Sequence, residues 1–70
     1  MHRYEIIIYW SREDGVYVAE VPELPGCMAH GKNDRDALRN VNDAVRLWLD
    51  TAKEFGHPIP EPKGRRLQLA

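Results

Sequence analysis

Residues 20–31, with the sequence EVPELPGCMAHG, divide the chain into a β-rich first part and a helical second part. Pro22 and Pro25 cannot donate to a β-ladder, and the pair formed by Pro25 and Gly26 is typical of a turn. We therefore expect a strand that stops just before Pro22, an extended passage, a turn at Gly26 and a new strand from Cys27. No catalytic chemistry is visible in this segment, so its value lies in fixing the architecture.

Runs of β-branched and aromatic residues predict strands at residues 3–10 (RYEIIIYW) and 16–21 (VYVAEV). A short third strand is expected after the proline segment at residues 27–30, and residues 64–70 (GRRLQLA) offer a fourth through Leu67 and Leu69. The polar stretch SREDG between the first two ends in Asp14 and Gly15, a strong hairpin signal. The first two strands should therefore lie antiparallel to each other.

A single helix is predicted for residues 34–55. Asn33 fits an N-cap with Asp36 at the third helical position, and Gly56 is a natural stop. At about 100° per residue, the apolar side chains fall on one arc of roughly 140°, the width of an ordinary core-facing stripe. That stripe consists of Ala37, Leu38, Val41, Ala44, Val45, Trp48, Leu49, Ala52 and Phe55.

The order strand, strand, strand, helix, strand predicts an α+β fold, β-β-β-α-β, with one helix on one face of a small, mostly antiparallel sheet. One helix covers one face only, whereas residues 6–10 put apolar side chains on both faces of the first strand. We expect the uncovered face to be a protein interface. Its predicted residues are Ile7, Tyr9, Val16 and Val18. The prediction is a homodimer, a larger assembly or a complex with a partner; the alternative is that the C-terminal tail folds back over this face.

The size and composition fit a single domain spanning residues 1–70. The one cysteine, Cys27, cannot form an internal disulfide, which favours a reducing, cytoplasmic location. The longest apolar run, residues 6–10, is far too short to span a membrane, and no signal peptide is visible. Ten basic and eleven acidic side chains argue against bulk attraction to nucleic acid, and DNA binding is not expected.

Candidate catalytic groups are sparse. Two-metal cleavage of a phosphodiester needs several carboxylates converging on sites about 4 Å apart, and the strands offer only Glu5 and Glu20. Cys27 lacks a recognisable base and oxyanion site, and the histidines have no metal-ligand spacing. We therefore expect no enzyme activity, no metal and no cofactor.

Charged residues repeat on the polar side of the predicted helix. The pairs Asp36/Arg39, Asp43/Arg46 and Asp50/Lys53 are spaced i,i+3, so a solvated ladder of ion pairs is the favoured interpretation. The alternative is a basic stripe that follows an RNA backbone. Its candidate contacts are Lys32, Arg35 and Arg39.

The run GVYVAEVPELPGCMAHG, followed by Asn33, Asp36 and Ala37 at a helix start and then by GHPIPEP, resembles the HicB-like antitoxin family. The similarity covers about residues 4–62. No single motif is specific to the family, but the motifs in this order are jointly a strong indication. The resemblance implies a partial RNase H-like fold and the role of antitoxin in a type II toxin–antitoxin system. The usual partner in that family is HicA, a small ribonuclease that cleaves mRNA and is silenced when the antitoxin binds it.

Many members of that family also carry a C-terminal DNA-binding domain. The sequence ends at Ala70, so we expect a short, stand-alone member without operator binding. The leading hypothesis is a module that neutralises a HicA-like ribonuclease by direct binding. The alternative is a stand-alone oligomeric module that binds RNA or another ligand, and a third hypothesis is a residual nuclease that uses Glu5 and Glu20.

Overall fold

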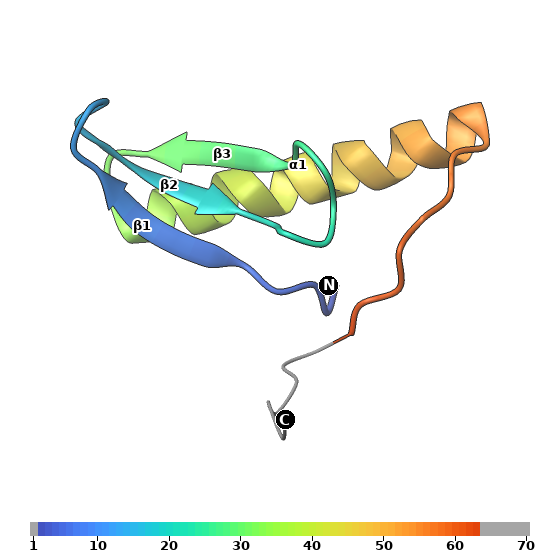
Figure 1. Cartoon of the computed structure of the whole chain (residues 1–70). Helices are drawn as coiled ribbons and strands as arrows, with labels where there is room; N and C mark the ends of the chain where they lie inside the picture. Colours follow the sequence, from blue (N-terminus) through green and yellow to red (C-terminus); the bar gives the residue numbers. More distant parts are fainter. Residues whose placement is uncertain (1, 64–70) are drawn as a thin grey trace, which may run out of the picture.

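Residues 2–63 are described by the computed structural model, in which three strands precede one long helix (Figure 1). The elements are β1 (Ile7–Ser11), β2 (Val16–Glu20), β3 (Met28–Gly31) and α1 (Asp34–Phe55). The strands form an antiparallel sheet in the order β1-β2-β3, and α1 lies behind it in Figure 1. The predicted α+β class is confirmed, whereas the strand expected at residues 64–70 lies outside the described residues.

The predicted strand ends need correction by a few residues. The first strand begins at Ile7 rather than at residue 3, because its partner strand ends at Glu20, opposite Ile7. Beyond Glu20 the backbone N–H of Val21 donates to Cys27 O (3.0 Å), and Pro22 has no N–H to offer. Residues 3–6 therefore have no ladder partner on β2. The third strand is likewise displaced by one residue, to Met28–Gly31, because the backbone of Cys27 closes the proline loop.

The helix has the predicted bounds and caps. Asn33 has an extended backbone, and its Oδ1 accepts a hydrogen bond from the N–H of Asp36 (2.8 Å). At the other end Gly56 adopts the left-handed conformation, and its N–H donates to Lys53 O (3.4 Å). Asp36 does not complete a capping box, because its carboxylate accepts from Arg39 instead of the cap. The local signals of the sequence thus define the whole of α1.

The core lies between α1 and one face of the sheet. Ala37, Val41 and Val45 of the predicted stripe are buried against Ala19 and other sheet residues. Two residues of the stripe differ from the prediction: Leu38 is 40% exposed and Phe55, the last residue of the helix, is 65% exposed. The helix packs mainly on β3 and β2, with few contacts to β1.

The proline loop between β2 and β3 is part of the core rather than a surface connection. Leu24 is fully buried, its N–H donates to Val21 O and its carbonyl accepts from Cys27 N, each at 3.0 Å. Trp48 on α1 donates from Nε1 to Pro25 O (3.0 Å). The loop is therefore fixed to the helix by one buried side chain and one indole hydrogen bond.

Gly31 sets the distance between β3 and the start of the helix. A Cβ atom on this residue would lie 2.2 Å from the backbone N of Ala37 and 2.7 Å from the carbonyl carbon of Asp36. Real Cβ atoms essentially never approach other atoms so closely. Asn40 adds a polar link, because its side-chain amide donates to His30 O (2.7 Å). The first turns of α1 consequently lie directly on the end of β3.

Candidate functional site

The sheet face opposite α1 is the first candidate surface. Residues directly opposite in an antiparallel ladder share a face, and the register joins Ile7 to Glu20, Tyr9 to Val18 and Ser11 to Val16. Pairing with β3 adds Met28, opposite Glu20, and His30, opposite Val18. We call this set the open face: Ile7, Tyr9, Ser11, Val16, Val18, Glu20, Met28 and His30. The four residues predicted for an interface therefore lie together on it.

The open face is unevenly accessible. Ile7 is 43% exposed, Tyr9 42% and Met28 45%, and they surround the central strand. Val16 is half-buried, and Val18 is only 3% exposed although α1 is on the other side of the sheet. Val18 lies between Tyr9 and the exposed His30, so its neighbours on the two outer strands cover it. A partner on this face would touch Ile7, Tyr9 and Met28, with Val18 as a support beneath them.

A hydrogen bond joins two polar groups of the open face, the hydroxyl of Tyr9 and the carboxylate of Glu20. The hydroxyl of Tyr9 donates to Oε2 of Glu20 at 2.9 Å, across β1 and β2. That bond is the main reason why the pKa of Tyr9 is raised above its ordinary value, with lesser contributions from desolvation and the negative charges of Glu20 and Asp14. The bond holds the ring of Tyr9 along the sheet, which preorganises the surface at its centre.

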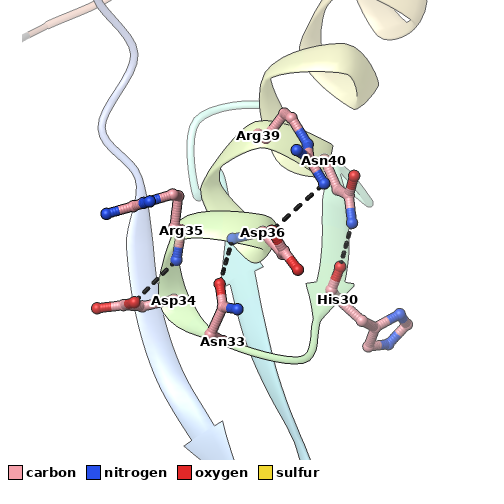
Figure 2. Close-up of polar contacts among 7 residues, drawn as sticks. All are labelled: His30, Asn33, Asp34, Arg35, Asp36, Arg39 and Asn40. Atoms are coloured by element: carbon pink, nitrogen blue, oxygen red, sulfur yellow. Dashed lines mark hydrogen bonds and ion pairs between the residues drawn. The ribbon is translucent and has the colours of Figure 1, made fainter.

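The three predicted RNA contacts lie at the start of α1 and do not converge. Lys32, Arg35 and Arg39 are all exposed. Figure 2 shows the side chains of Arg35 and Arg39 extending in different directions. Arg39 forms an ion pair with Asp36 at 3.3 Å, and the Arg35 backbone N–H donates to Asp34 Oδ1 at 2.8 Å (Figure 2). The carboxylates of Asp34 and Asp36 therefore lie close to these three basic side chains in the sequence.

The predicted ladder of ion pairs forms at one of its three steps in the part of the chain that the structure describes. Asp36 and Arg39 are joined, whereas Asp43/Arg46 and Asp50/Lys53 are not within ion-pair distance. Exposed i,i+3 pairs contribute only a few tenths of a kcal/mol, which is too little to hold long side chains in one geometry.

The candidate catalytic groups are not assembled into a site. Glu20 accepts from the hydroxyl of Tyr9, and Glu5 lies before β1, where no residue of β2 stands opposite it. Burial raises the pKa of the Cys27 thiol, which disfavours the nucleophilic thiolate. Within residues 2–63, no group of three or more His, Cys, Asp or Glu side chains could hold a metal ion.

The helix α1 does not have the length and apolar character of a membrane span, and the residues that the structure describes contain no other helix.

Three exposed apolar residues were not predicted as candidate interface residues from the sequence, and only one of them lies on the open face. Met28 belongs to the open face, and strand alternation from the buried Cys27 would have placed it there. Trp10, 51% exposed, and Ile8, 36% exposed, lie on the other side of β1 at the edge that α1 leaves uncovered. The aromatic rings of Trp10 and Tyr17 meet edge to face with centroids 5.1 Å apart. No pattern in the sequence shows how far a helix reaches across a sheet.

The chain thus folds as a small α+β domain with exposed apolar side chains on one sheet face. Comparison with known proteins identifies the family to which the chain belongs. The family described as the HicB-like antitoxin of bacterial toxin–antitoxin systems matches residues 4–67. The chain belongs to this antitoxin family.

Relatives occur in archaea and bacteria. A UPF0150 protein of Thermoplasma acidophilum is 37% identical over 67 residues, 96% of each chain. Another from Synechocystis is 39% identical over 81% of this chain and 77% of its own, and one from Archaeoglobus fulgidus is 38% identical over 67% and 68%. No solved structure matches the chain.

Proposed function

We propose that the chain is the antitoxin of a toxin–antitoxin pair and neutralises a HicA-like, mRNA-cleaving ribonuclease by binding it directly through the open face. Membership of the antitoxin family supports the class of function. The observation that carries the mode of action is the exposure of Ile7, Tyr9 and Met28 on one face of the sheet, on the two strands that flank β2, where α1 does not cover them. The role requires no catalysis by this chain, because binding alone covers the surface of the ribonuclease.

The composition of the open face suits protein recognition. Ile7, Tyr9 and Met28 supply accessible aliphatic and aromatic area, and Glu20 lies between Ile7 and Met28 on the central strand. Tyr and Met are among the residues enriched in protein interfaces. Full burial of one large apolar side chain contributes about 1.5–3 kcal/mol. The charged Glu20 would help to set orientation and encounter rate.

We also propose that two copies associate through the open face when no toxin is bound. The exposed apolar side chains would then be covered in both states, and toxin binding would compete with self-association. The mass of the full chain in solution tests this point: a dimer or larger assembly is expected, and Ile7→Lys should shift it towards the monomer. A monomer for the wild-type chain at high micromolar concentration would refute self-association but would leave toxin binding to its own test.

The antitoxin role itself is tested by growth. A HicA-like ribonuclease from the source genome, expressed alone, should arrest growth, and co-expression of this chain should restore it. Tyr9→Lys should abolish the rescue because it places a charge at the centre of the interface. Leu47→Lys is the matched control, since Leu47 is 68% exposed on the outer side of α1 and should tolerate the change. Rescue by Tyr9→Lys equal to that by the wild type would contradict the proposed surface.

An RNA-binding module is the second candidate. It is supported by the exposure of Lys32 and Arg35, neither of which forms an ion pair within residues 2–63. The interspersed Asp34 and Asp36 weaken it. Salt-dependent binding of single-stranded RNA at submicromolar protein, lost in the double variant Lys32→Gln/Arg35→Gln, is the result that this candidate requires.

A further inference from the structure

A cavity lies on the helix side of the sheet, away from the open face. The helix α1 packs on β3 and β2 more than on β1, and the cavity lies between the N-terminal arm that leads into β1 and one side of the helix. The cavity has a volume of about 630 Å³. It is lined by His2 from the arm and by Asn42, Val45, Arg46 and Leu49 from α1.

One side of the cavity is ordered by a chain of hydrogen bonds. The backbone N–H of Tyr4 donates to Nδ1 of His2 (3.1 Å), so Nε2 carries the ring hydrogen and donates to Oδ1 of Asn42 (2.8 Å). The Asn42 side chain is thereby fixed in orientation, with its oxygen towards His2. Its NH₂ group has no partner within residues 2–63 and remains able to donate. The arm itself is anchored by Tyr4, which is buried in the core and donates from its hydroxyl to Pro60 O.

The cavity also contains a cation without an anion. Arg46 is one turn of α1 beyond Asn42 and was expected to pair with Asp43, yet among the described residues it forms no ion pair and no hydrogen bond. None of the lining residues in the described part of the chain is acidic. Val45, which is almost fully buried, and the partly buried Leu49 provide an apolar wall beside the guanidinium. The lining thus combines two donors, one of them charged, with an apolar surface.

We propose that this cavity binds a small organic carboxylate, an acid with a short apolar body. The carboxylate would accept hydrogen bonds from the Arg46 guanidinium and the Asn42 amide, since arginine matches the geometry of a carboxylate well. The apolar body would lie against Val45 and Leu49. The volume lies within the 300–1,000 Å³ typical of small-molecule sites. Within residues 2–63 five residues line the cavity, far fewer than the roughly twenty per side of a stable protein interface.

This site is independent of the proposed antitoxin function because it lies on the opposite side of the sheet from Ile7, Tyr9 and Met28. If no carboxylate binds in the cavity, the proposal that the open face binds a toxin is unaffected. Conversely, loss of toxin binding in variants of the open face would not affect the cavity.

Titration of the full chain with octanoate tests the proposal. Backbone amide shifts in two-dimensional NMR should move at Asn42, Arg46 and the residues around His2, with calorimetry giving the dissociation constant. The same titration with 1-octanol, which has the apolar body but no carboxylate, should give at least tenfold weaker binding. Absence of shifts with millimolar octanoate, or equal binding of octanoate and octanol, would overturn the proposal.

Two arginine variants localise the carboxylate. Arg46→Gln should weaken octanoate binding roughly tenfold, because it removes a charge-assisted hydrogen bond, and the exposed position should leave the fold intact by circular dichroism. Arg39→Gln removes the same charge from an arginine that is already paired with Asp36 and should leave the affinity unchanged. Equal effects of the two substitutions would refute a specific role for Arg46.

Discussion

The contact between β3 and the start of α1 can be tested by one methyl group, through Gly31→Ala. The added Cβ would lie 2.2 Å from Ala37 N and 2.8 Å from Ala37 Cα, whereas ordinary contact begins at 3.4 Å. Both neighbours are backbone, so the helix must move by roughly 1 Å relative to the strand, a displacement on the scale of overpacking that costs about 1–3 kcal/mol. We expect the upper half of that range, because no flexible side chain can give way.

Urea unfolding, followed by tryptophan fluorescence and circular dichroism, measures the loss. The expected loss is large beside the total stability of a domain of this length, on the order of 4–10 kcal/mol, and should lower Tm by roughly 10–20 °C. Gly15→Ala is the matched control: Gly15 has φ +66 but nothing within 4 Å of an added Cβ, so its cost is that of the left-handed backbone, about 1–2 kcal/mol. If Gly31→Ala were no more destabilising than Gly15→Ala, the close approach of β3 to α1 would be wrong.

Three further predictions concern stability in the same unfolding assay. Leu24→Ala should lose about 2–5 kcal/mol because Leu24 is fully buried; a loss below 1 kcal/mol would mean that the proline loop is not part of the core. Asn33→Ala should lose about 1 kcal/mol with the N-cap, while Asn33→Asp should retain most of it. Stability should fall as the pH rises above 9, because burial raises the pKa of Cys27 and, with Glu23 and Glu61, that of Tyr4, so the unfolded chain loses these protons first. Cys27→Ala should flatten the pH dependence between pH 9 and 10, and an unchanged slope would refute the assignment to this thiol.

Local signals were sufficient to predict the helix. The cap at Asn33, the apolar repeat and the stop at Gly56 all act within a few residues, so the bounds of α1 agree with the prediction. Strand ends were less predictable, because they depend on a partner: residues 3–6 have β-forming sequence but nothing on β2 to pair with beyond Glu20. The hydrogen bond of Cys27 to Leu24 similarly delayed β3 by one residue.

The candidate surfaces also have features that strand geometry alone predicts and features that depend on how the elements pack. Period-two alternation groups Ile7 with Tyr9 and Val16 with Val18, and taking the polar Glu20 as the outer side of the second strand was enough to join the two pairs on one face. The burial of Val18 was not predictable, because it results from side chains on both neighbouring strands. The cavity beside Asn42 was also hidden, since it depends on where the helix lies across the sheet.

The affinity of the full chain for its HicA-like toxin, measured by calorimetry for the wild type, Ile7→Lys and Leu47→Lys, tests the proposed antitoxin surface most directly. Ile7 and Leu47 are both exposed aliphatic residues, on the open face and on the outer side of α1 respectively. We predict that Ile7→Lys raises the dissociation constant at least tenfold, equivalent to about 1.4 kcal/mol, while Leu47→Lys leaves it within twofold. An unchanged dissociation constant for Ile7→Lys, or a loss confined to Leu47→Lys, would contradict binding through the open face.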